Sequence, residues 1–430
     1  MSKKITLVWP AQAVITESLF RHFSMLAEVA GYLNKKSKII KEINAEIEIE
    51  DCAVVAHTAM NMARIVHESD VIALAVNMNN VKESIDTANF FKSVDKNKKI
   101  VVYGEAIACG SSFFANQSVF DYVVDSGQFE LGIEVALYHI FQEKLTTASL
   151  PININDCVHD GNLIRFSKNL TLPETDWGIP QLDLLPIKEY LRIGNGELHI
   201  TTCKGCPYDC EFCNEKYVSS HKLRYRPHKQ IVEYLTETAY AYGASSVYLD
   251  ASTFTYNREW VIELCNELIS SSKKSIPWKT CTRLDCLDEE LISLMAKAGC
   301  IRISVGVESI SKPIQNRISK KTNHGDLISF SQICHQNGII PRALLIIGLK
   351  GQRSSEIYKA EKFFQKLGIQ TRFRVLQDFS FMTNGKNKKT YLENFERLNR
   401  WLISSPFEEI DINEIRKFEY PFSRNKYNFS

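Results

Sequence analysis

Residues 203–213 read CKGCPYDCEFC, which places four cysteines within eleven residues of a chain that contains twelve. Cysteines two or three residues apart close only small, strained disulfide loops, so disulfides explain this spacing poorly. Zinc sites usually separate two Cys-x2-Cys pairs by about a dozen residues or more, whereas only three residues lie between Cys206 and Cys210. Iron–sulfur clusters take thiolate ligands from runs as dense as this one. We therefore expect an iron–sulfur cluster, and the surrounding sequence has to indicate what it does.

The cysteine run follows the first of six apolar segments that alternate with amphipathic ones from residue 195 onward. The expected strands are residues 197–202, 246–251, 278–283, 301–308, 342–348 and 371–377. The expected helices are residues 228–242, 258–271, 288–298, 325–337 and 354–366. Repeated β/α units predict a partial (β/α)6 TIM-type barrel over residues 195–377, with chemistry at the carboxyl ends of the strands. The cysteine run lies at such an end, where a cofactor is expected.

Residues 1–145 show a similar alternation and predict another domain of the α/β class. The expected strands are 5–9, 38–43, 71–76, 99–104 and 120–124, with helices at 24–33, 81–94 and 130–142. This pattern predicts a doubly wound, Rossmann-like parallel sheet, which binds ligands at the carboxyl ends of its strands. Neither a Gly-x-Gly-x-x-Gly motif nor a P-loop occurs there, so a nucleotide site is not expected.

Two segments lie outside these domains. Residues 146–194 lose the periodicity and contain prolines and glycine–asparagine turns, which predicts a linker with little structure of its own. Residues 378–430 are polar and aromatic, and they predict a small C-terminal extension with one helix at 391–404.

The composition is that of an ordinary globular protein, with 44% hydrophobic residues, 24% charged residues and a net charge of +2. So small a charge predicts no nucleic-acid partner and no membrane surface as partner. No apolar stretch is long enough for a signal peptide or a membrane span. Scattered cysteines in apolar segments indicate buried thiols of a reducing compartment, so we expect a cytoplasmic protein. These are Cys52, Cys109, Cys157, Cys265, Cys281, Cys286, Cys300 and Cys334.

The spacing Cys206-x3-Cys210-x2-Cys213, after the first barrel strand, resembles the signature of the radical S-adenosylmethionine (radical SAM) enzymes. The resemblance implies that three thiolates hold a 4Fe–4S cluster and leave one iron open for S-adenosylmethionine. It also implies an electron donor such as a flavodoxin or ferredoxin, and it puts Phe212 beside the adenine. Cys203 falls outside the spacing and is interpreted as a thiol at the strand end.

Other strand ends match, less closely, the positions at which this family binds S-adenosylmethionine. Asp250 and Ser252 stand where the family has a Gly-Gly-Glu motif that receives the methionine ammonium group, and a carboxylate there keeps the charge pairing. The resemblance implies a role for Arg283 toward the methionine carboxylate or the substrate. It implies contacts to ribose or methionine from Ser304 and Glu308, and to adenine from Ile346.

The order of doubly wound domain, linker and barrel resembles that of the cobalamin-binding radical SAM enzymes. The segments VVYGEAIAC (101–109) and FDYVVDSGQFE (120–130) look like altered forms of the family's glycine-rich loops over the corrin, which assigns Gly104 and Gly127 to cobalamin. The family's Asp-x-His-x-x-Gly motif, whose histidine binds cobalt from below, is absent. The resemblance therefore implies cobalamin held without a histidine ligand, or a domain that no longer binds it.

The leading functional prediction is a methyltransferase that acts on an unactivated carbon, or on phosphorus, in a small metabolite or peptide. A carbon without an acidic proton cannot become a nucleophile near neutral pH, so a radical or a methyl–cobalt species is needed. The alternative keeps the radical step without methyl transfer, as in a rearrangement, cyclisation, ring contraction or epimerisation. Less well supported are a methylthiotransferase, which needs a second cluster on Cys52, Cys109 and Cys157, and a cluster-binding scaffold.

Overall fold

The computed structural model of the chain describes residues 2–376, except 11–18, 56, 78–79, 167–169, 211, 220, 319, 321 and 350–351. The predicted extension at 378–430, with its helix, lies outside the described residues. The described chain divides into two compact units. The first combines the residues up to Gly196 with Asn214–Pro227, and the second combines Glu197–Cys213 with the residues from His228 onward.

A seven-stranded sheet forms the centre of the first unit, in the order β2-β1-β3-β4-β5-β7-β6. Its strands pair in parallel, apart from the antiparallel pair of β6 with β7. Because β1 lies between β2 and β3, the strand order reverses there, and such a switch point is where doubly wound sheets bind ligands. The strands are β1 (Lys3–Trp9), β2 (Ala45–Asp51), β3 (Val71–Ala75), β4 (Lys99–Tyr103), β5 (Tyr122–Asp125), β6 (Cys157–Asp160) and β7 (Leu163–Phe166), and the short β10 (Arg224–Tyr225) lies outside this sheet.

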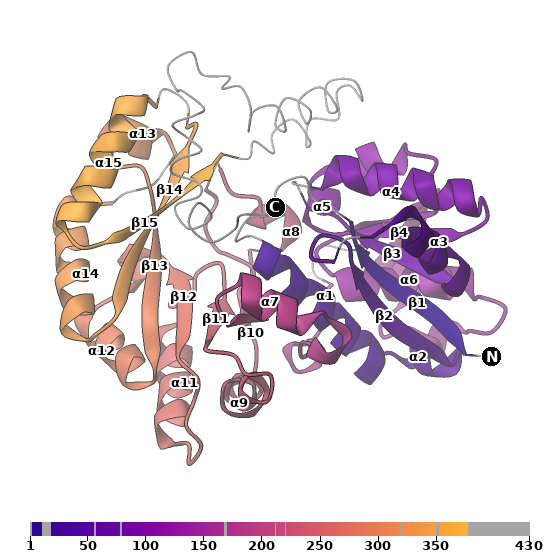
Figure 1. The fold of residues 1–430 in the computed structure, drawn as a ribbon, viewed down its shortest axis with the longest axis horizontal. Helices are drawn as coiled ribbons and strands as arrows, with labels where there is room; N and C mark the ends of the chain where they lie inside the picture. Colours follow the sequence, from indigo (N-terminus) through magenta and orange to yellow (C-terminus); the bar gives the residue numbers. More distant parts are fainter. Residues whose placement is uncertain are drawn as a thin grey trace. The chain divides into compact units, whose positions relative to one another are not determined.

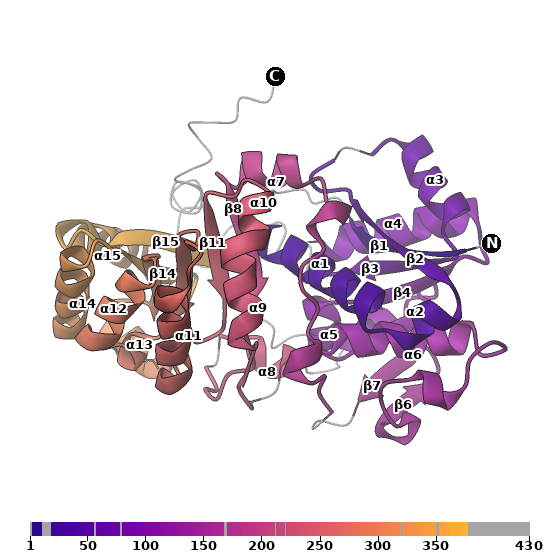
Figure 2. The same ribbon diagram turned by 90° about the horizontal axis from the view of Figure 1, so that it is seen from below.

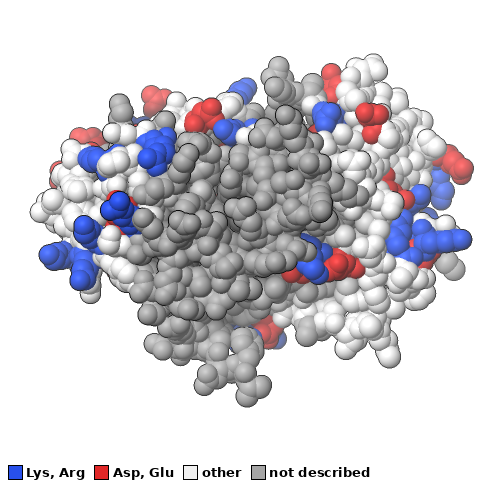
Figure 3. All heavy atoms as spheres, turned by 90° about the horizontal axis from the view of Figure 1, so that it is seen from above, with Lys and Arg blue, Asp and Glu red and all other residues white. Residues whose placement is uncertain are grey.

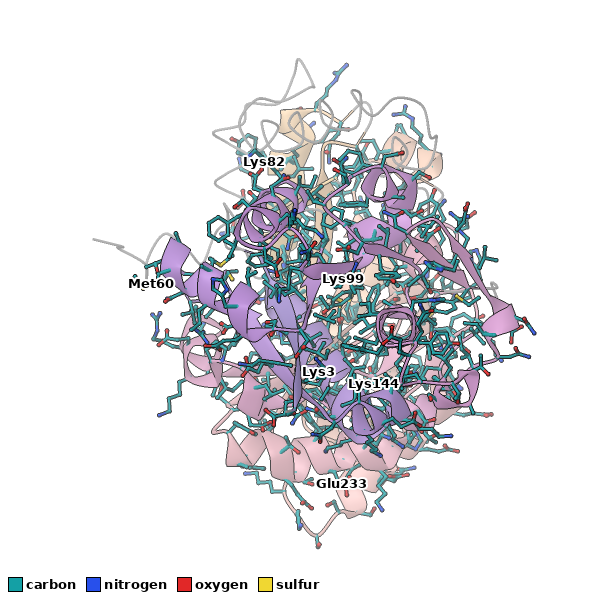
Figure 4. The ribbon with its side chains drawn as sticks, turned by 90° about the vertical axis from the view of Figure 1, so that its right-hand side faces the viewer. Lys3, Met60, Lys82, Lys99, Lys144 and Glu233 are labelled. Atoms are coloured by element: carbon teal, nitrogen blue, oxygen red, sulfur yellow. The ribbon has the colours of Figure 1, made fainter. Side chains whose placement is uncertain are left out.

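Helices cover both faces of this sheet, with α3 against α4 on one face and α1 against α6 on the other (Figures 1 and 2). Strand β3 is buried along its whole length, as expected for a central parallel strand. Met60, near the start of α3, is 81% exposed and projects from the end of its helix (Figure 4). The helices are α1 (Leu19–Lys35), α2 (Lys38–Glu42), α3 (Ala59–Glu68), α4 (Val81–Val94), α5 (Glu105–Ala115), α6 (Phe129–Ile140), α7 (Ile187–Ile193) and α8 (Glu215–Val218).

Two sequence predictions for this unit were wrong. Residues 38–43 were expected as a strand, but they form α2, which begins at the N-cap Ser37. The helix buries Ile39 and Ile40, and the buried Ile43 follows its last turn. Apolar residues at positions i, i+1 and i+4 lie on one face of a helix. The strand itself begins later and covers Ala45–Asp51. The predicted linker contains the β6–β7 hairpin, because the turn at Gly161, with φ +62°, joins two strands of the sheet.

The second unit is a six-stranded sheet in the order β15-β14-β13-β12-β11-β8, and every neighbouring pair is parallel. The six predicted strands and the five predicted helices are confirmed. The strands are β8 (Glu197–Thr201), β11 (Ser246–Asp250), β12 (Trp278–Thr282), β13 (Cys300–Glu308), β14 (Ile340–Ile347) and β15 (Gln370–Val375). Outside the sheet, β9 (Cys203–Lys204) follows β8.

Helices line the outer face of this sheet, where α11, α12, α14 and α15 lie side by side (Figure 1). Apolar residues of the strands, such as Val247, Trp278 and Ile303, are fully buried. The helices are α9 (His228–Glu233), continued by a π-helix at Tyr234–Thr238 and α10 (Ala239–Ala241), then α11 (Arg258–Ser270), α12 (Glu289–Lys297), α13 (Lys312–Arg317), α14 (His324–Gln336) and α15 (Ser354–Lys366). No helix in the described ranges is long and apolar enough to cross a bilayer.

Candidate functional site

The cysteine run occupies the loop that follows β8, the first strand of the second unit. Cys206, Cys210 and Cys213 are half-buried and take part in no disulfide, whereas Cys203 is only 4% exposed. A hydrogen bond of 3.1 Å from the Cys213 amide to the Cys210 carbonyl folds the loop into a turn. The Cys206 thiol lies 3.8 Å from the Thr253 hydroxyl, which follows β11. Three accessible thiols on one short loop suit a cluster that binds three cysteines.

These thiols do not converge on one point. No three donor side chains in the described part of the chain are close enough together to hold a single metal ion. A 4Fe–4S cluster has no such requirement, because each cysteine binds a different iron of the cluster. Burial raises the pKa of the Cys210 thiol, while Lys320 and Arg283 lower it, so two cations favour its thiolate form.

Tyr208, between the first two of these cysteines, is held by residues that follow β12. The Arg283 guanidinium lies 3.8 Å from the centroid of the Tyr208 ring, and the Tyr208 hydroxyl lies 3.7 Å from the Cys286 sulfur. Asp285 accepts two hydrogen bonds from Arg283, at 2.9 and 2.6 Å. Arg283 therefore contacts the cysteine loop itself. The sequence analysis missed Tyr208, although its position inside the cysteine run was a visible signal.

Glu308, the last residue of β13, is strained and buried. It has a φ of +66°, which is unfavourable for a side chain with a Cβ, and it is 8% exposed. Its carboxylate lies 3.6 Å from the Lys320 ammonium group. Burial raises the pKa of Glu308, while Lys320 and Arg283 lower it. A Cβ on Gly306 would lie 2.6 Å from the Glu308 carboxylate and 3.2 Å from the Lys320 ammonium group, so a side chain at this position would displace the ion pair.

Lys320, the partner of Glu308, was not predicted from the sequence, because no recognisable motif surrounds it after α13. The positive φ of Glu308 is a strained conformation. Such strain persists only where the surrounding structure enforces it, and it is common at functional sites.

The remaining predicted residues of this unit fall into two groups. Phe212 and Ile346 pack against one small apolar cluster, which Ile314, Ile318 and Leu349 form. Asp250 ends β11 and pairs in register with Thr201, and Ser304 is buried in β13 at 2% exposure. Ser252 follows β11, and its carbonyl accepts a hydrogen bond from the Thr253 hydroxyl. The structure thus brings Phe212 and Ile346 together and puts Asp250 at a carboxyl strand end.

The two predicted glycines of the first unit allow close backbone contacts. Gly104, with φ +127°, follows β4, and a Cβ there would lie 2.3 Å from the Val76 carbonyl. A Cβ on Gly127 would lie 1.5 Å from the carbonyl of Val218 in α8. The ring nitrogens of His57 lie 2.6 Å from the Val55 carbonyl and 2.9 Å from the Glu50 carboxylate.

Residues 200–364 match the model of the radical SAM superfamily. This stretch contains the end of β8, the whole cysteine motif and the four complete strands β11, β12, β13 and β14. It is therefore a radical SAM domain.

The whole described fold resembles that of a solved radical SAM methyltransferase. TsrM from Kitasatospora setae, determined with cobalamin and a [4Fe–4S] cluster bound, aligns with a TM-score of 0.66 at 15% identity. The alignment covers 87% of this chain and 75% of TsrM. At this identity the likeness concerns the fold, and it extends across the doubly wound sheet and the barrel sheet.

Two curated relatives are similar in sequence. An uncharacterized methyltransferase of Pyrococcus horikoshii is 27% identical over 191 residues, which are 44% of this chain and 41% of that protein. The anaerobic magnesium-protoporphyrin IX monomethyl ester cyclase of Rubrivivax gelatinosus is 25% identical over 279 residues, 58% of this chain and 48% of the cyclase. The chain thus matches less than half the length of either relative.

Proposed function

We propose that this chain is a cobalamin-dependent radical SAM methyltransferase. One observation carries the proposal: Cys206, Cys210 and Cys213 are half-buried thiols on the loop after the first strand of an all-parallel sheet, inside a radical SAM domain. Three thiolates are the donor set of a 4Fe–4S cluster with one open iron. When bound, the reduced cluster supplies the electron that cleaves S-adenosylmethionine.

We assign different side chains around this loop to different parts of S-adenosylmethionine. Phe212 and Ile346 share an apolar cluster that would receive the adenine. Asp250, at the carboxyl end of β11, is a carboxylate for the methionine ammonium group. Ser304 and the buried Glu308 are the candidates for ribose or methionine contacts. Arg283 already contacts Tyr208 and Asp285, so we assign it to holding the cluster loop in place.

Cobalamin would occupy the carboxyl ends of the strands of the first unit. The reversal of strand order at β1 supports this position, because ligands of doubly wound sheets bind there. Gly104 lies at the same edge, directly after β4, and we propose that the loop it begins lies beside the cobalamin. His57 is engaged with Glu50 and Val55, so we propose binding without this histidine as ligand. When bound, cobalamin would serve as the carrier of the methyl group.

A second candidate function is a radical reaction without methyl transfer. The similarity to the Rubrivivax cyclase favours it, since that relative matches more of this chain than the Pyrococcus methyltransferase does. Both candidates use the same three cysteines and differ in the fate of the methyl group.

The experiment follows that group. The full chain, loaded anaerobically with its cluster and hydroxocobalamin, is incubated with a reductant and S-adenosylmethionine labelled in the methyl group. Candidate metabolites are supplied as a mixture, and the products are analysed by mass. A product that carries the label supports the methyltransferase. Formation of 5′-deoxyadenosine with an unlabelled, altered metabolite would instead assign the second function.

A further inference from the structure

The end of β13 is built around a single strained residue, Glu308. The pairing of β13 with β14 shifts register between Gly306 and Glu308, so Val307 is an extra residue, a β-bulge. A hydrogen bond of 2.8 Å from the Ser309 amide to the Val307 carbonyl closes a three-residue turn around Glu308. With a φ of +66°, this is the γ-turn of positive φ, the rarer and more strained of the two γ-turn forms. Bulges beside active sites often redirect a side chain in this way.

The side chain that this turn presents belongs to a buried ion pair. The Glu308 carboxylate lies 3.6 Å from the Lys320 ammonium group, and the two side chains are 11% and 7% exposed. By contrast, acidic and basic side chains are interspersed over the described part of the surface in Figure 3. A buried charge is costly unless its partner is held in place. Because twelve positions separate Glu308 from Lys320, other contacts have to close the loop between them.

Gln315 of α13, which is 1% exposed, supplies such contacts. Its side-chain amide donates a hydrogen bond of 2.7 Å to the carbonyl of Ser309, the residue directly after Glu308. Its main-chain carbonyl accepts a hydrogen bond of 2.9 Å from the Lys320 amide. One residue therefore binds the backbone at both ends of the loop, next to one member of the ion pair and at the other.

Only the donor half of the Gln315 side-chain amide is used. Its Oε1 atom is buried and has no hydrogen-bond partner within the described ranges. A buried acceptor without a partner loses its hydration without compensation. An apolar side chain of similar size would avoid that cost, but it would leave the Ser309 carbonyl without this donor. The amide at position 315 is therefore explained by the turn that it holds.

We infer that Gln315 is a positioning residue, which holds Glu308 in its γ-turn and keeps the carboxylate beside Lys320. The inference rests on the proposed function only in giving that carboxylate a role toward S-adenosylmethionine. Strained conformations persist when the surrounding structure enforces them. Here the enforcing contact comes from outside the strand, from a helix that begins after the turn. Gln315 itself acts through Glu308 and has no need to touch the cofactor.

Crystal structures of the full, cluster-loaded chain test the turn directly. The unchanged chain should show Glu308 at positive φ with its carboxylate beside Lys320. Gln315→Met is close in size but has no donor, so it should release Glu308 to negative φ and separate the ion pair. Gln315→Asn keeps an amide that is too short to reach the Ser309 carbonyl, and it should act in the same way if the methionine variant does not fold. An unchanged turn in these variants would overturn the inference.

Binding of S-adenosylmethionine, measured by calorimetry, distinguishes positioning from a general structural role. Glu308→Gln and Gln315→Met should each weaken binding about tenfold. Combined in one chain, they should weaken it no more than Glu308→Gln alone, because residues that act through one contact are not additive. Gln332→Met, on the exposed side of α14, is the control and should bind like the unchanged chain. Additive losses, about a hundredfold in the double variant, would overturn the inference.

Failure of the proposed function would give a different result. In that case Glu308→Gln would bind S-adenosylmethionine as tightly as the unchanged chain, while the Gln315 variants would still lose the γ-turn. This outcome would remove Glu308 from the cofactor site and would still support Gln315 as the residue that positions it.

Discussion

At the scale of single residues, the account depends on which thiols bind the cluster. Cys206, Cys210 and Cys213 are half-buried, whereas Cys203 is buried and lies in β9, the short strand that follows β8. We expect Ala at any of the first three positions to abolish the brown absorbance of the 4Fe–4S cluster, because two thiolates hold it poorly. Cys203→Ala is the matched control and should keep both iron and absorbance. Loss of the cluster in Cys203→Ala with retention in Cys213→Ala would reverse the ligand assignment.

Arg283 allows a second prediction at this scale. Its contact with the Tyr208 ring stabilises the cysteine loop, and cation–π contacts contribute about 0.5–2 kcal/mol. Arg283→Gln should therefore release iron to a chelator about three- to tenfold faster than the unchanged chain. Arg258→Gln, which removes a surface arginine paired with Asp288 and Glu290, should not alter the rate. An unchanged rate together with weaker binding of S-adenosylmethionine would assign Arg283 to the cofactor.

At the scale of elements, a buried carboxylate between α1 and α6 makes stability depend on pH. Glu134 of α6 accepts a hydrogen bond of 2.7 Å from Tyr32 of α1. Burial raises the pKa of Glu134 from an ordinary value of 4.5 to about 7, and the negative charge of the neighbouring Glu130 raises it as well. Between these two values the folded chain keeps a proton that the unfolded chain has lost. The free energy of unfolding therefore falls as the pH rises through this window, by about 3 kcal/mol.

Glu134→Gln removes this penalty and keeps an oxygen that can accept from Tyr32. The variant should unfold at a higher temperature than the unchanged chain at pH 8, and the difference should shrink toward pH 5. Thermal unfolding followed at both pH values measures it. Glu143→Gln, an exposed change just after α6, is the control and should leave the pH dependence as it was. A stabilisation by Glu134→Gln that is equal at both pH values would contradict the assignment.

Elements also show where the sequence was informative. In the barrel, long apolar strands alternate with helices of clear periodicity, so both could be predicted. Residues 38–43 were harder, because six residues with three isoleucines fit either a strand or a short helix, and Ser37 decides for the helix by capping it. Contacts between residues that are distant in the sequence could not be predicted. Lys320 meets Glu308 only after the chain has folded, and the positive φ of Glu308 leaves no trace in the sequence.

At the scale of the whole molecule, the chain joins a radical SAM domain to a doubly wound unit. One of the covalent connections between them follows the cluster motif directly: Cys213 belongs to the second unit, and the segment from Asn214 to Pro227 belongs to the first. That segment is anchored in the first unit by Arg226, which is fully buried and lies 3.5 Å from the Glu28 carboxylate. No periodicity in the sequence predicts that this segment belongs to the first unit. The assignment depends on where its two buried arginines, Arg224 and Arg226, are packed in the folded chain.

The central claim is that the first unit holds cobalamin, and one measurement tests it most directly. The full chain is loaded anaerobically with its cluster and with hydroxocobalamin, passed through gel filtration, and examined for bound cobalamin and its absorption spectrum. The account predicts one cobalamin per chain, with the dimethylbenzimidazole base off the metal and no histidine signature, because the cobalt-binding histidine motif is absent. A chain that keeps its cluster and cleaves S-adenosylmethionine but emerges without cobalamin would contradict the claim.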